Sequence, residues 1–222
     1  MQKFDTVAPV FAVLDIPAGR IRIIAADRTD TTVEVLPADA SKGRDVQAAE
    51  QTAVEYRDGV LRIAAAPVKN RILGHTGSVE VTVRLPAGSR VEAKTAAADL
   101  RGVGRLGDVA YEGAQGTVKL DETAGARLAL LAGDITVGRL GGPADIGTQK
   151  GDITVDEAVS GTVTLRTEAG DLTVGARRGV SASLDADTVY GRIHNSLRNT
   201  DGAPGLTIHA NTSYGNITAR SL

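Results

Sequence analysis

Short stretches of alternating apolar and polar residues recur along the chain. The second half repeats a phrase that is clearest as Gly-Asp-Ile-Thr-Val at residues 133–137 and 151–155, with a close variant at residues 170–174. The third position of the phrase is apolar in every copy, and its neighbours are mostly polar: Leu100, Val118, Ile135, Ile153, Leu172, Ile193 and Ile217. Alternation with a period of two predicts strands rather than helices.

The copies follow one another at short intervals. Their opening small residues are separated by 18, 17, 18, 19, 21 and 24 residues: Ala98, Gly116, Gly133, Gly151, Gly170, Gly191 and Gly215. A second alternating stretch precedes the phrase, for example at residues 163–167, 182–186 and 206–210. Two short strands joined by glycine-rich corners make one coil, and coils stacked at an interstrand spacing of roughly 4.8 Å make a β-solenoid. The sequence therefore predicts an all-β fold, with a solenoid of about 18-residue coils over residues 81–222.

Residues 1–80 have a related but less regular pattern. We expect strands at residues 32–36, 59–64 and 78–85, a short helix within residues 41–52 and an exposed loop at residues 65–77. An end coil presents unpaired N–H and C=O groups and an apolar cross-section, so a solenoid needs a cap. We predict that residues 1–80 form a β cap that continues into the solenoid as one domain.

Stacking would align equivalent side chains into rows. One predicted row lies on an outer face and consists of Thr136, Thr154, Thr173 and Thr218. A second row lies three residues before each glycine and consists of Thr148, Thr167, Thr188 and Thr212. The opening glycine is expected at a corner, either with positive φ or where the chain passes close to the neighbouring coil.

The chain stops directly after its last phrase, at Arg220-Ser221-Leu222. Two interpretations remain open for this end. Polar side chains and the segment 195–205 can blunt the exposed strand edge, or two molecules can associate through the C-terminal coil. If the chain forms a homo-oligomer, we expect it to do so through that coil.

Three groups of residues, namely aspartates, tyrosines and histidines, could take part in catalysis or ligand binding. Asp134, Asp152 and Asp171 occupy the same position in successive coils, where stacked carboxylates could bind calcium or act as acid and base on a polysaccharide. The same position holds Thr117, Arg192 and Asn216 elsewhere, and aspartate after glycine commonly accepts hydrogen bonds from backbone N–H groups at corners. We therefore favour a structural role, and we predict no catalytic, metal or cofactor-binding residue.

The aromatic and histidine residues are few. Tyr111, Tyr190 and Tyr214 are the candidates in the repeats for an exposed aromatic platform, and Tyr190 and Tyr214 each precede a coil-opening glycine. They should stack on adjacent coils, either as a ladder that shields the corner or as a ligand platform. His75, His194 and His209 form no recognisable triad by spacing, and we interpret His75 and His194 as solvated surface residues.

The composition of the chain limits which residues can form the core and which functions are expected. The chain of 222 residues has 26 Gly, no Cys, no Trp and only six Phe and Tyr residues, so its core must consist of Val, Ile, Leu and Ala. A formal net charge of −2 without a basic face excludes nucleic-acid binding from the expected functions. The sequence has neither a signal-peptide pattern nor an apolar stretch long enough to span a membrane, so we expect a cytoplasmic protein.

The repeated phrases resemble a known family. Leu-Pro-Ala-Gly at residues 85–88, followed by Thr-x-x-Gly-Asp-Ile-Thr-Val at residues 148–155 and its variant at residues 167–174, is similar to the bacterial β-strand-repeat proteins known as putative adhesins. The resemblance covers residues 80–220 well. It implies a right-handed β-solenoid with a role in surface attachment or envelope-stress sensing.

We therefore predict a non-enzymatic interaction protein that binds a protein or glycan partner through a flat face rich in Thr, Ser and Asp. The partner-binding residues are not identified. A first alternative is a cytoplasmic self-assembling scaffold similar to bactofilins. A second is an enzyme that acts on polysaccharide, which would need a loop long enough to wall a cleft.

Overall fold

The computed structural model describes residues 1–66, 77–199 and 203–222, which form two compact units, Met1–Gln115 (unit 1) and Gly116–Leu222 (unit 2). The predicted loop at residues 65–77 falls mostly outside the described residues, as does His75. The described part of the chain is nearly all β, with one helix.

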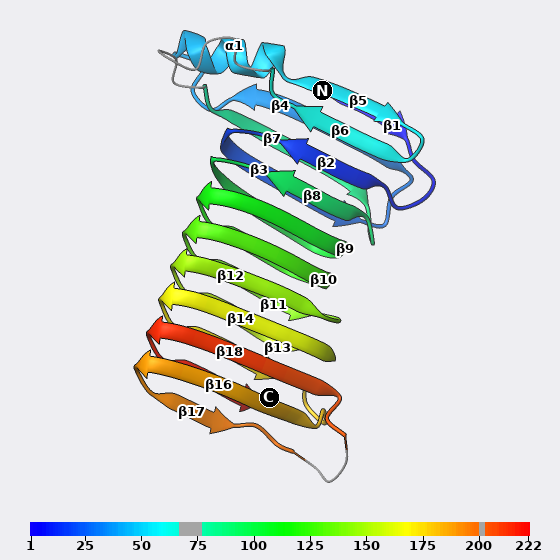
Figure 1. The fold of residues 1–222 in the computed structure, drawn as a ribbon. Helices are drawn as coiled ribbons and strands as arrows, with labels where there is room; N and C mark the ends of the chain where they lie inside the picture. Colours follow the sequence, from blue (N-terminus) through cyan, green and yellow to red (C-terminus); the bar gives the residue numbers. More distant parts are fainter. Residues whose placement is uncertain (67–76, 200–202) are drawn as a thin grey trace. The chain divides into compact units, whose positions relative to one another are not determined.

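Unit 1 contains strands that pair mainly in parallel. Its elements are β1 (Gln2–Asp5), β2 (Phe11–Asp15), β3 (Ala18–Ala26), β4 (Asp30–Pro37), α1 (Gly43–Gln51), β5 (Ala53–Arg57), β6 (Val60–Ala64), β7 (Val79–Pro86), β8 (Arg90–Lys94) and β9 (Ala97–Gln115). β2 pairs in parallel with both β6 and β8, and β3 pairs in parallel with both β7 and β9. The coil formed by β2 and β3 therefore lies between strands that come much later in the sequence (Figure 1).

The outer strands of unit 1 pair in the opposite sense. β4 is antiparallel to β7 and to β1, and β5 is antiparallel to β6. The predicted helix within residues 41–52 and the predicted strands at residues 32–36, 59–64 and 78–85 are confirmed as α1, β4, β6 and β7.

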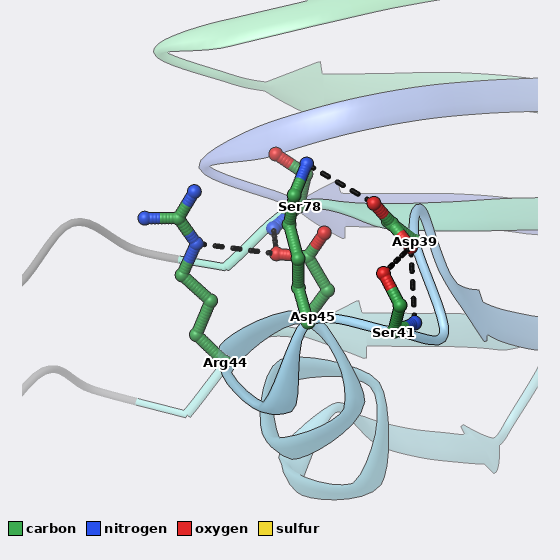
Figure 2. Close-up of polar contacts among 6 residues, drawn as sticks. Asp39, Ser41, Arg44, Asp45 and Ser78 are labelled. Carbon is green, nitrogen blue, oxygen red and sulfur yellow. Dashed lines mark hydrogen bonds and ion pairs between the residues drawn. The ribbon is translucent and has the colours of Figure 1, made fainter.

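Helix α1 is attached to the start of β7 by a buried carboxylate. Asp45 is only 4% exposed, and its Oδ1 accepts a hydrogen bond of 3.0 Å from the Ser78 N–H (Figure 2). The turn before the helix is held by Asp39, whose Oδ1 accepts hydrogen bonds from the N–H and the hydroxyl of Ser41. These bonds, together with Lys42, lower the pKa of the exposed Asp39 carboxyl to about 2.

Unit 2 is built from stacked two-stranded coils. Its strands are β10 (Val118–Ala132), β11 (Ile135–Leu140), β12 (Ala144–Lys150), β13 (Ile153–Ala158), β14 (Gly161–Ala169), β15 (Leu172–Ala176), β16 (Ala182–Tyr190), β17 (Ile193–Ser196), β18 (Leu206–Tyr214) and β19 (Ile217–Ser221). All the pairings given below are parallel. In one series of paired strands the order is the second half of β10, then β12, β14, β18 and β16. In the other series the order is the first half of β10, then β11, β13, β15, β19 and β17. This arrangement is β-solenoid-like.

The coils of unit 2 do not stack in sequence order. β18 lies between β14 and β16 (Figure 1). β19 lies between β15 and β17. The prediction that the C-terminal coil is the exposed end is wrong, because that coil is paired on both sides. The outermost coil of unit 2 is formed by β16 and β17.

Aliphatic side chains fill the interior, as the composition predicts. In β11, β13, β15 and β19 the inward positions form continuous rows, and the side chains in them are at most 1% exposed: Ile135, Val137, Ile153, Val155, Leu172, Val174, Ile217 and Ala219. In the outermost coil the equivalent Ile193 is 46% exposed, because no further described coil covers it.

Candidate functional site

The glycine that opens each phrase forms a crowded corner. A Cβ built on Gly151 would lie 2.2 Å from the carbonyl oxygen of Gly133, and one built on Gly170 would lie 2.0 Å from that of Gly151. Both glycines also have positive φ, 144° and 157°. The sequence prediction offered positive φ or close approach, and these corners have both, so only glycine fits.

The repeated aspartates bond to the backbone of the next coil. Asp134 Oδ1 accepts a hydrogen bond of 2.9 Å from the Asp152 N–H, and Asp152 Oδ1 accepts one of 2.8 Å from the Asp171 N–H. Asp171 Oδ1 accepts one of 2.7 Å from the Asn216 N–H, and Asn216 Oδ1 accepts one of 3.1 Å from the Arg192 N–H. The aspartates therefore form a structural ladder, which accounts for their recurrence.

The threonines three residues before the glycine complete the corner. Each hydroxyl donates to the carbonyl oxygen of the corner glycine in the preceding coil of the stack, at 3.0 to 3.4 Å: Thr148 to Gly133, Thr167 to Gly151, Thr212 to Gly170 and Thr188 to Gly215. The phrase Thr-x-x-Gly-Asp thus encodes a corner in which the threonine hydroxyl, the glycine carbonyl and the aspartate carboxylate all have partners. Within the described residues, no group of three His, Asp or Glu residues could hold a metal ion.

The predicted outer row of threonines is confirmed by the strand register. Thr136, Thr154, Thr173 and Thr218 are direct cross-strand neighbours on β11, β13, β15 and β19, and all four are half-buried. His194 on β17 continues the row beside Thr218 and is exposed. We call this surface the threonine face and define it by these four threonines.

The three tyrosines have different environments. Tyr190 and Tyr214 stack as predicted, with ring centroids 4.9 Å apart and planes 8° apart, and they are 63% and 60% exposed. Tyr111 is not a platform residue, because it is 2% exposed. Its hydroxyl donates to the Ala98 carbonyl at 2.7 Å and lies 2.8 Å from Thr95 Oγ1. Burial raises the pKa of the Tyr111 hydroxyl above its usual value.

Shallow depressions occur on the outer sheets of both units. The one in unit 2 has a volume of about 300 Å³ and is lined by Thr164, Leu165, Arg166, Asp185, Asp187, His209, Ala210 and Asn211. The one in unit 1 has a volume of about 320 Å³ and is lined by Arg20, Ile21, Arg22, Glu80, Val81, Thr82, Asp99 and Arg101. Both have charges of both signs, and in each an arginine forms an ion pair with a carboxylate: Arg166 with Asp145 at 2.9 Å and Arg20 with Glu80 at 3.2 Å.

Sequence reasoning missed the surroundings of His209. His209 Nδ1 lies 3.3 Å from Asp185 Oδ2, a contact between β18 and β16 that depends on the changed stacking order. The only signal for that order was the longer spacing of the last glycines, 21 residues from Gly170 to Gly191 and 24 from Gly191 to Gly215.

The stacked coils and bonded corners define a β-solenoid-like protein whose repeated phrase forms the hydrogen-bonded corners. The chain belongs to the Toastrack DUF4097 family, whose model matches residues 13–221. No curated protein matches the sequence. In the described residues, no helix is both long and apolar enough to span a membrane.

Solved structures with low sequence identity are similar to this chain. A structure described as a putative cell adhesion protein from Clostridium sporogenes shares 12% identity, with 100% of this chain and 99% of that chain covered and a TM-score of 0.42. A structure described as a putative adhesin from Parabacteroides distasonis shares 15% identity, with 98% and 95% covered and a TM-score of 0.47. One described as a putative lipid binding protein from the same species shares 13% identity, with 98% and 95% covered and a TM-score of 0.47.

Proposed function

We propose that this chain is a non-enzymatic binding protein that engages a protein or glycan partner through the threonine face. The observation that carries this proposal is the straight row of Thr136, Thr154, Thr173 and Thr218, one hydroxyl per coil. The row repeats at the interstrand spacing of roughly 4.8 Å, which suits an extended partner held by many weak contacts. We also propose right-handed coils of about 18 residues, in line with register offsets of 17, 18 and 19 residues between successive partners in the series Val118, Ile135, Ile153 and Leu172.

The corner bonding supports a binding role over a catalytic one. Asp152 and Asp171, the carboxylates considered for polysaccharide cleavage, both accept backbone hydrogen bonds and are placed by them. The depressions of about 300 and 320 Å³ are shallow surface features formed by strands rather than clefts walled by loops.

The strand order bears on the scaffold alternative. Head-to-tail stacking of solenoids needs parallel strand edges that can continue one another. The outer strands β1, β4 and β5 of unit 1 pair antiparallel, and helix α1 comes between β4 and β5 in the sequence. Both features disfavour a bactofilin-like polymer.

The test is capture of ligands by the intact chain and by a variant with a blocked face. Thr154→Lys combined with Thr173→Lys places two long charged side chains in the middle of the threonine face. Thr164→Lys, at a half-buried outward position on β14, is the matched control. We expect binding to a glycan array, or cross-linked partners from a bacterial lysate, to be lost only in the double variant. Equal binding by the double variant and the control would contradict the proposal.

A further inference from the structure

The outer edge of β16 is an open parallel strand. β16 pairs with β18 along Ala182–Tyr190, and within the described residues no strand pairs with its other side. The beginning of that edge is closed, because the Ala182 N–H donates to the Arg198 carbonyl at 3.1 Å. From Asp185 to Tyr190 no described residue pairs with this edge, so this stretch can accept another strand.

Two cross-strand rows of polar and charged residues on the outer surface both end in a carboxylate on β16. One row runs from Asp145 through Thr164 and His209 to Asp185, and the next from Gly147 through Arg166 and Asn211 to Asp187. Arg166 bonds to Asp145 at 2.9 Å, and His209 lies 3.3 Å from Asp185, whose side chain is still 84% exposed. Among the described residues, no basic side chain forms an ion pair with Asp187. A strand added beyond β16 would be favoured if it carried basic residues opposite both aspartates, because opposite charges directly across neighbouring strands attract.

The aromatic ladder ends at the same edge. Tyr214 stacks on Tyr190 at 4.9 Å, and nothing in the described part of the chain stacks on the far side of Tyr190, which is 63% exposed. A third ring in this row would lie three positions after the second basic residue, since Tyr190 comes three residues after Asp187. Ring stacking and charge pairing thus point to one partner strand in one register.

The hydrogen bonds at the corners add a threonine and a glycine to the sequence pattern expected of a partner strand. In each inner corner the glycine carbonyl accepts a hydrogen bond from the threonine of the next coil, as Gly215 does from Thr188 at 3.0 Å. The Gly191 carbonyl is the last of this series. A partner strand with threonine directly after its second basic residue and glycine after its aromatic residue would complete that corner as the inner coils do.

We propose that the β16 edge accepts a parallel strand of a partner protein with the pattern basic-x-basic-Thr-x-aromatic-Gly. The basic residues would face Asp185 and Asp187, and the aromatic ring would stack on Tyr190. A second copy of this chain fits less well, because its own β16 would bring Asp185 and Asp187 against the same carboxylates. This site is separate from the threonine face and does not depend on it.

The test uses a capped, fluorescently labelled peptide whose core reads Lys-Ala-Lys-Thr-Val-Tyr-Gly, with the full chain at low salt and neutral pH. A second peptide has aspartate in place of both lysines. We expect the basic peptide to bind at least tenfold more tightly than the acidic one, measured by fluorescence anisotropy. Asp185→Lys combined with Asp187→Lys should reverse that preference, whereas Asp156→Lys on β13 should leave it unchanged.

A third peptide separates strand pairing from attraction between charges alone. It keeps the two lysines and is N-methylated at alternate amides, which removes N–H donors but not charge. We expect its binding to be at least tenfold weaker than that of the unmethylated peptide. Equal binding of the methylated peptide, equal binding of the acidic peptide, or an unchanged preference in the double variant would each overturn the proposal. So would a concentration-dependent dimer, measured by light scattering, that competes with the basic peptide.

Discussion

Units 1 and 2 both hold a coil from near one end of the sequence between two other pairs of strands, but they differ in how the outer edge is closed. In unit 1, β2 and β3 lie between the coil of β6 and β7 and the strands β8 and β9. In unit 2, β18 and β19 lie between the coil of β14 and β15 and that of β16 and β17. Beyond β6 and β7, unit 1 adds the antiparallel strands β5, β4 and β1 and a helix, whereas in unit 2 no described strand pairs beyond the parallel coil of β16 and β17.

The strand order shows that the last two strands in the sequence, β18 and β19, do not lie at the edge of unit 2, whereas the first strand, β1, lies at the edge of unit 1. A terminal coil with neighbours on both sides is protected from fraying, which is common at termini that lie on a sheet edge. The strand that remains exposed in unit 2 is protected in another way, by carboxylates at Asp185 and Asp187, a usual means of preventing unspecific strand pairing.

The largest expected effect comes from removing an inserted coil. Deletion of residues 206–222 takes away the partner of β14 and β15 and the partner of β16 and β17. The lost coil includes five buried apolar side chains, Leu206, Ile208, Ala210, Ile217 and Ala219, whose burial is worth on the order of 5–10 kcal/mol. We expect hydrogen exchange to show loss of protection throughout residues 161–196.

Deletion of residues 1–5 is the matched change in unit 1. It removes β1, which pairs only with β4 among the described strands, and it should lower the unfolding temperature only slightly. If the two deletions reduce stability equally, the inserted coil has no special role and the comparison between the units fails.

The second effect concerns the crowded corners of unit 2. In Gly151→Ala the new Cβ would lie 2.2 Å from the Gly133 oxygen at a φ of 144°, so we expect a loss of about 2–4 kcal/mol in the free energy of unfolding. Gly43→Ala in helix α1 of unit 1 is the control, because nothing lies within 4 Å of its Cβ position. Alanine favours a helix by up to about 1 kcal/mol over glycine, so this variant should be no less stable than the original chain in chemical denaturation.

Much of this fold could be predicted from the sequence, because the alternation and the repeated phrase are local signals. The strands, helix α1, the Thr136 row and the structural role of Asp152 follow from them. The stacking order could not be predicted, because β16 and β18 both end in the pattern Ala-x-Thr-x-Tyr followed by glycine, at residues 186–191 and 210–215, and either strand could pair with β14. The choice depends on long-range packing that no short window contains.

The third effect contrasts a buried tyrosine of unit 1 with an exposed one of unit 2. Tyr111→Phe removes the buried hydrogen bond from the hydroxyl to the Ala98 carbonyl, so we expect a loss of about 1–2 kcal/mol. Tyr190→Phe keeps the stacked ring and removes only an exposed hydroxyl, so the change should be below about 0.5 kcal/mol. Both variants would be compared in parallel by denaturation. Equal losses in the free energy of unfolding would contradict this contrast.

Tyr111 also gives unit 1 a pH dependence with a defined sign. Burial raises the pKa of its hydroxyl in the folded state above that of an unfolded tyrosine, near 10. The resulting contribution to stability is fully present below pH 10 and is lost as the pH rises through the raised folded pKa. We expect spectrophotometric titration to show one tyrosine that ionises later than in denaturant, and Tyr111→Phe should abolish that late phase.

The smallest effect tests the aspartate ladder of unit 2 against the view that these carboxylates have a chemical role. Asp152→Ala removes the acceptor for the Asp171 N–H, a bond of 2.8 Å at an exposed corner, and by analogy with helix caps should cost about 1 kcal/mol. Asp152→Asn should cost almost nothing, because an amide oxygen can accept the same bond, as Asn216 does from the Arg192 N–H at 3.1 Å. If the asparagine variant is as unstable as the alanine variant, the negative charge itself is required at this position, and the ladder would have to be explained by something other than backbone hydrogen bonding.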